Sequence, residues 1–155
     1  MDLHPNLDAL APLLGTWRGE GHGEYPTISS FDYADEWVFS HTGKPFVAFV
    51  QRTRSPAGAP MHTEAGYLRA TPAVEIVAAL PTGQTELGTG TAEVSDGVLL
   101  VSTDAEVRCT ASAKTVDRIV RRFRLEGDVL DYDMEMAAVG VGLTLHLRSR
   151  LTRVQ

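Results

Sequence analysis

The sequence predicts an all-β domain, either a closed barrel or a sandwich, on three observations. Short apolar runs recur at the spacing of hairpin strands, turn residues separate them, and no long stretch shows the helical period of about 3.6 residues. The chain of 155 residues is long enough for one domain with a sizeable core. We therefore expect a single domain over residues 1–155, in which a closed barrel would have room for one small molecule or cofactor.

The elements follow from local patterns in chain order. Residues 5–14 are expected to form a short helix or helical turn, with Asn6 as its N-cap and Pro12 limiting its length. Strand patterns occupy the glycine-rich stretch from Gly15 onward and then residues 46–50, 75–80, 98–103, 119–125 and 143–148. Turn residues lie at 43–45, 55–58, 81–83 and 95–97, and Glu126-Gly127-Asp128 has hairpin chemistry.

The clearest strand runs from Leu130 to Met136. Its apolar residues alternate with three acids, so one face is apolar and the other acidic: Leu130, Tyr132, Met134 and Met136 against Asp131, Asp133 and Glu135. This alternation is typical of an antiparallel sheet with one solvated face. We expect cross-strand partners for these acids among the nearby arginines Arg118, Arg121, Arg122 and Arg124.

Composition excludes several classes of protein. The chain has 14 Lys and Arg against 20 Asp and Glu, a net charge of −6, which argues against a nucleic-acid partner. No apolar run approaches the roughly 20 residues that cross a bilayer, and the first twelve residues lack the basic start of a signal peptide. The single Cys109 can form no internal disulfide, so a reducing, cytoplasmic location is expected.

A glycine-rich strand is the densest local feature. Gly15, Gly19, Gly21 and Gly23 surround Trp17 and leave one strand face almost without side chains. Glycine within a strand marks a bend, a bulge or the close approach of another group. We interpret the pattern as barrel closure around a buried Trp17 rather than as direct ligand contact.

Motifs of common enzymes are missing. No serine lies in a Gly-x-Ser-x-Gly elbow, and the chain has no His-Glu-x-x-His, paired-cysteine or Walker motif. Five histidines are present, at positions 4, 22, 41, 62 and 146. Taken singly, each histidine is expected to be solvated or structural, and the residue pattern alone favours no reaction.

Several ordered blocks resemble the nitrobindin family. Gly15-Thr16-Trp17-Arg18-Gly19-Glu20-Gly21 matches the family pattern Gly-x-Trp-x-Gly-x-Gly in full, and the block from Tyr25 to Ile28 follows it. The stretches from Phe39 to Pro45 and from Gly58 to Tyr67 agree as well. The resemblance covers nearly the whole chain, from about Leu14 onward.

This resemblance implies an antiparallel up-and-down barrel of about ten strands, similar to lipocalins and fatty-acid-binding proteins, that holds one heme b. It implies isomerisation of peroxynitrite to nitrate and binding of nitric oxide. By the same resemblance His146 is the proximal heme ligand and the catalytic, metal-binding residue. Thr27 matches a heme contact, Met61 and His62 match a pocket pair on the distal side, and Met136 matches a further pocket methionine.

The strand of His146 departs from simple alternation. A regular strand would place His146 with Thr144 and Arg148, on the more polar face. Either a β-bulge turns its side chain inward, or Leu143, Leu145 and Leu147 face the partner of a homodimer. The preceding segment, residues 137–142, also replaces a threonine-rich stretch of the family, which affects the expected loop shape.

Three functions remain open at this point. The first is a heme-dependent peroxynitrite isomerase. The second is a non-catalytic heme or nitric-oxide carrier or sensor on the same barrel. The third is a lipocalin-like barrel for another apolar ligand, in which His146 is structural.

Overall fold

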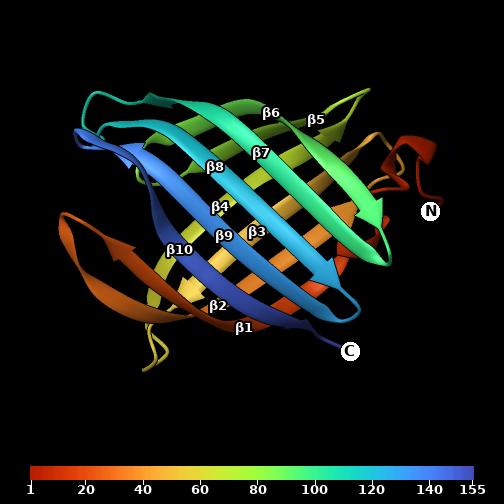
Figure 1. Ribbon diagram of the computed structural model, residues 1–155, viewed down its shortest axis with the longest axis horizontal. Helices are drawn as coiled ribbons and strands as arrows, with labels where there is room; N and C mark the ends of the chain where they lie inside the picture. Colours follow the sequence, from red (N-terminus) through yellow and green to blue (C-terminus); the bar gives the residue numbers. More distant parts are fainter.

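Ten antiparallel strands close into one barrel in the computed structural model, which describes residues 1–155 (Figure 1). Each strand pairs with the next along the chain, and β1 pairs with β10. The predicted up-and-down barrel is therefore confirmed, and the sandwich is excluded because closure leaves no sheet edge. The strands are β1 (Gly15–Tyr25), β2 (Ile28–His41), β3 (Phe46–Arg54), β4 (Pro60–Ala70), β5 (Val74–Leu80), β6 (Gln84–Ser95), β7 (Val98–Cys109), β8 (Val116–Glu126), β9 (Val129–Ala138) and β10 (Val141–Arg153).

The expected N-terminal helical turn is present as two short 3-10 helices, η1 (Pro5–Leu7) and η2 (Ala11–Leu13). The predicted N-cap is wrong, because Asn6 lies inside η1 and donates its backbone N–H to Nδ1 of His4 at 3.2 Å. Pro5 suits the first helical position, where no N–H is needed, and this moves the cap back to His4. Neither helix is long and apolar enough to cross a membrane.

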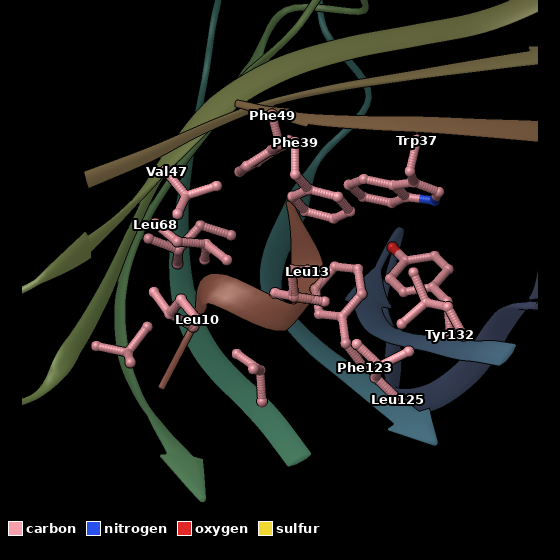
Figure 2. Close-up of a cluster of buried hydrophobic side chains, with 14 of the residues drawn as sticks. Leu10, Leu13, Trp37, Phe39, Val47, Phe49, Leu68, Phe123, Leu125 and Tyr132 are labelled. Atoms are coloured by element: carbon pink, nitrogen blue, oxygen red, sulfur yellow. The ribbon is translucent and has the colours of Figure 1, made fainter. Parts of the chain in front are cut away.

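The helices cover one end of the barrel, where the apolar core lies (Figure 2). Leu7, Leu10 and Leu13 are fully buried in a cluster with aromatic residues from several strands. Trp37 stacks on Phe39 with ring centroids 5.5 Å apart. We call this the helix-covered end, with strand turns at 42–45, 71–73, 96–97 and 127–128.

The glycines of β1 allow close packing where the barrel closes. A Cβ at Gly19 would lie 1.9 Å from the carbonyl oxygen of Arg150 on β10. At Gly21 and Gly23 it would lie 2.3 and 2.2 Å from the rings of Tyr33 and Phe31 on β2, respectively. The interpretation of this strand as barrel closure around a buried Trp17 is confirmed, because neighbouring strands fill the space of the missing side chains.

The acidic face of β9 is solvated and ion-paired, as expected, but its partners differ from the prediction. Only Arg122 among the four arginines pairs with that face, at Glu135. Arg148 and Arg150 on β10 pair with Asp133 and Asp131 instead, because β10 is the other neighbour of β9. The remaining arginines have other partners: Arg118 pairs with Asp104, Arg124 with Glu126, and Arg121 faces the interior.

Candidate functional site

The five predicted site residues come from distant parts of the chain and lie at one end of the barrel. This is the end opposite the helices, formed by the turns at 26–27, 55–59, 81–83, 110–115 and 139–140, and we call it the site end. In Figure 1 it is on the left, away from both chain termini. Thr27 lies in the β1–β2 turn, Met61 and His62 near the start of β4, Met136 near the end of β9, and His146 in the first half of β10.

A β-bulge places His146. Leu145 lies opposite Glu135 on β9 and Leu147 lies opposite Met134, so His146 is an extra residue without a partner of its own. The expected bulge is therefore confirmed, and it reverses the alternation of β10 at this point. Leu147 packs against the apolar core, so the three leucines do not share one outer face and the alternative explanation for His146 is wrong. The homodimer itself stays a prediction.

The His146 ring is held by strand β1 and by two aromatic rings. Its Nδ1 lies 3.0 Å from the carbonyl oxygen of Glu24, which can only accept, so the ring hydrogen is on Nδ1. Tyr25 and Phe31 meet the imidazole edge to face, with ring centroids 5.4 and 6.3 Å away. The Nε2 atom has no hydrogen-bond partner within the protein, so its lone pair is free.

Burial favours the neutral form of His146. Desolvation lowers the pKa of His146 below its ordinary value of 6.5, and the nearby His62 lowers it further. The hydrogen bond to Glu24 acts in the opposite direction but does not reverse the shift. Because a metal ion binds the neutral imidazole, this environment favours a ligating form of the side chain.

Tyr25 spans the place where β1 and β10 separate. The β1–β10 pairing stops at Gly23 and Leu147. Beyond it, the Tyr25 hydroxyl donates to the carbonyl oxygen of Met136 at 3.1 Å and accepts from the N–H of Ala138 at 3.0 Å, both on β9. The side chain thus joins β1 to β9 beside the bulge. It also holds the backbone next to Glu24, whose carbonyl oxygen accepts the hydrogen bond from His146.

A second bulge lies at the start of β4. Arg52 pairs with Thr63 and Arg54 pairs with Pro60, so Met61 and His62 together lie opposite the single residue Thr53. The backbone N–H of His62 donates to the Thr53 hydroxyl at 3.0 Å. His62 is half-buried and Met61 is 47% exposed, so both side chains are accessible at the rim.

The other two predicted residues differ in exposure. Met136 belongs to the inward-facing series of β9 and is packed, partly buried, against the core. Thr27 is exposed at the tip of its turn. All five residues therefore border the site end, from the barrel interior at Met136 to solvent at Thr27.

A buried layer of charge below the site end escaped the sequence prediction. Arg121 is fully buried and bonds to the carboxylates of Glu64 and Glu86 and to the hydroxyl of Tyr132. A signal was available, because Arg121 falls in register with Ile119 and Phe123, the inward-facing residues of β8. Glu64 likewise falls in register with Leu68, an inward-facing residue of β4.

The residues at this end fit a heme group. An imidazole with one nitrogen anchored to a backbone carbonyl and the other free is the usual arrangement of a metal-ligating histidine. One histidine is sufficient as the protein ligand of a heme iron. The apolar surfaces of Tyr25, Phe31 and Met136 beside it suit a flat hydrophobic macrocycle.

Comparison with known proteins gives one consistent result. A family model described as the THAP4-like, heme-binding beta-barrel domain matches residues 6–153. "Peroxynitrite isomerase 2" of Mycobacterium marinum is 52% identical, covering 98% of this chain and 97% of the relative. "Peroxynitrite isomerase" of Nocardia farcinica is 50% identical, covering 97% of this chain and 92% of the relative. The crystal structure of Rv2717c from M. tuberculosis superimposes with a TM-score of 0.96 at 44% identity, over 99% of this chain and 100% of that one.

Proposed function

Because the chain belongs to the THAP4-like heme-binding β-barrel family, we propose that it is a heme-dependent peroxynitrite isomerase with His146 as the proximal ligand. The observation that carries the assignment of the ligand is the anchored imidazole. The His146 ring is held through Nδ1 by Glu24 and free at Nε2, and burial lowers its pKa, which favours the neutral form. Heme b is the cofactor, and nitric oxide is a second small ligand that we propose for the same site.

When bound, ferric heme would supply Lewis-acid chemistry for the isomerisation of peroxynitrite to nitrate. The protein's residues hold and orient this group. His146 offers the Nε2 lone pair, and the carbonyl of Glu24 together with Tyr25 and Phe31 limits rotation of the ring. In this proposal His146 is the single protein ligand, and His62 would border the substrate rather than bind the iron.

The other four predicted site residues would surround the heme and the substrate in this proposal. Met136 provides an apolar wall continuous with the core, and Thr27 a polar contact at the outer edge. Met61 and His62 border the side where substrate enters. Their accessibility at the rim supports this role, since a group that meets substrate must be reachable from solvent.

Ferric heme titration followed by absorption spectroscopy tests the proposal. We expect one-to-one binding by the wild type with the Soret band of a histidine complex, and loss of that band in His146→Ala. His22→Ala is the matched control, because His22 is an exposed histidine on the outer face of β1, paired with Asp32. Equal binding by wild type and His146→Ala, or binding by neither, would mean that the ligand is wrong and that the barrel serves another molecule.

Stopped-flow decay of peroxynitrite then separates an enzyme from a carrier. Loaded protein should convert peroxynitrite to nitrate faster than the same concentration of free hemin. If it does not, while heme still binds through His146, the function is that of a heme or nitric-oxide carrier or sensor. The cytoplasmic location, the homodimer and the single-domain organisation remain predictions from the sequence.

A further inference from the structure

A second histidine at the site end, His62, is also held through one ring nitrogen, in this case by a carboxylate. Nε2 of His62 lies 3.3 Å from Oε2 of Glu64, and Nδ1 of His62 has no hydrogen-bond partner within the protein. The side chain of His62 is 29% exposed, whereas that of Glu64 is 1% exposed. A ligand at the rim can therefore reach His62 but not the carboxylate that holds it.

Glu64 is itself held by hydrogen bonds. The Arg121 guanidinium donates to both of its oxygens, from Nη1 to Oε1 at 2.5 Å and from Nη2 to Oε2 at 3.1 Å. Such a two-point contact fixes the plane of a carboxylate. Arg121 is held in turn by both oxygens of Glu86 and by the Tyr132 hydroxyl, 2.8 Å from Nη1. The position of Oε2 beside His62 is thus set by the buried layer of charge.

The charge of Glu64 decides where the hydrogen lies. Burial alone would raise its pKa, but the Arg121 charge and the hydrogen bond from His62 lower the pKa of Glu64 to about 2. An ionised carboxylate can only accept hydrogen bonds, so the hydrogen between the two groups is on Nε2 of His62. A neutral His62 then carries its free lone pair on Nδ1.

We propose that Glu64 is a positioning residue that fixes the orientation and tautomer of His62, so that Nδ1 is presented to the substrate. This inference rests on the proposed function, in which His62 borders the substrate side. Peroxynitrous acid is the protonated substrate. Its O–H bond breaks as Nδ1 takes the proton, the anion remains to react, and the proton passes from Nδ1 to water afterwards. Glu64 does not touch the substrate at any stage.

The tautomer can be measured directly by nitrogen NMR of the full-length, heme-free protein labelled in its histidines. His62→Ala identifies the His62 signals. At a pH where the imidazole is neutral, we expect hydrogen on Nε2 in the wild type and loss of this preference in Glu64→Gln. Glu86→Gln is the matched control, because it removes the other carboxylate of Arg121 without touching His62. It should keep the wild-type tautomer.

Several results would overturn the proposal. Hydrogen on Nδ1 in the wild type does so without any variant, even if Glu64→Gln fails to fold. Equal changes in Glu64→Gln and Glu86→Gln would show a general effect of the buried charges. In heme-loaded protein, Glu64→Gln should slow peroxynitrite decay by roughly tenfold, a part of what a positioned general base contributes. The same change should slow the decay no further when His62 is already alanine. A further loss in the double variant would contradict positioning through His62.

If the wild type takes up no heme, the proposed function fails, while the tautomer still decides the role of Glu64.

Discussion

Val139 is a residue in an unfavourable backbone conformation beside the site. It has φ +48° and is followed by Gly140 at +82°, so both central residues of the β9–β10 turn are left-handed. The β6–β7 turn has positive φ at Asp96 and Gly97 as well, and there the aspartate–glycine pair suits this geometry. A β-branched side chain is a poor choice for this region, because its Cβ substituents crowd the backbone.

Val139→Asn should therefore stabilise the protein. Asparagine tolerates the left-handed region and precedes a glycine here, so we expect a gain of about 1 kcal/mol in the free energy of unfolding. Urea denaturation measures it. Asp96→Asn is the control and should change stability by less than about 0.5 kcal/mol. A loss of stability in Val139→Asn would show that the partly exposed valine makes contacts worth more than the strain.

Single residues also show what could be read from the sequence. Alternation places Met136 inside the barrel and Asp131 outside, as the structure does. The same alternation applied to β8 would have placed Arg121 inside, but a charged residue in an apolar register is usually expected at the surface. Its two carboxylate partners are 57 and 35 residues away in sequence, on β4 and β6, so no local pattern could have paired them.

At the scale of elements, the two N-terminal helices cover the core with buried leucine side chains. Leu13 is fully buried, and its carbonyl oxygen accepts the indole N–H of Trp17 at 2.7 Å. Helices this short have no stability of their own, because they gain too few hydrogen bonds to offset ordering the chain. They are held in place by the side chains that they bury.

Leu13→Ala should accordingly destabilise the whole barrel. We expect a loss of about 2–5 kcal/mol in the free energy of unfolding, from the cavity left under η2. Thermal denaturation is sufficient to detect it. Val94→Ala on β6 serves for comparison, since Val94 is 59% exposed and should cost less than about 0.5 kcal/mol. Similar losses in the two variants would mean that the helices contribute little to the core.

Of the two β-bulges at the site end, only the one in β10 could be expected from the sequence. The sequence of β10 indicated that His146 lay on the wrong face of a regular strand, so a bulge could be expected there. The bulge in β4 gave no such sign, because Met61 and His62 precede the alternating part of the strand. A bulge is a property of the pairing between two strands, and it becomes visible only when the register of the partner is known.

At the scale of the whole molecule, the interior contains two buried acids whose pKa values are shifted in opposite directions from their ordinary values. Desolvation raises the pKa of Asp35 to about 6, although hydrogen bonds from Ser149, Gln51 and Trp37 oppose the shift. Glu64 behaves in the reverse manner, with a pKa of about 2. The two groups therefore act on stability in different ranges of pH.

The sign of each effect follows from proton binding. Folded protein binds more protons than unfolded protein at Asp35, so stability should fall as pH rises from 3.8 to about 6. At Glu64 the unfolded protein binds more, so stability should fall as pH drops from 4.5 to about 2. Each contribution is on the order of 3 kcal/mol.

Urea unfolding across this range of pH measures both. Asp35→Asn should remove the decline between about pH 4 and 6, and Glu64→Gln should flatten the decline in acid. Asp131→Asn on the outer face is the control and should leave the shape of the curve unchanged. An identical profile for Asp35→Asn and wild type would show that Asp35 titrates normally.

Both ends of the chain emerge at the helix-covered end (Figure 1). Arg153 donates to the carbonyl oxygen of Leu14 at 2.7 Å, and the N–H of Val154 donates to the carbonyl oxygen of Thr16 at 2.8 Å. A tag, a fused protein or a surface linker joined to either terminus would thus point away from His146. Immobilised through its ends, the protein would present the site end to the solution. A short peptide joining the termini would allow new termini to be opened elsewhere in the chain.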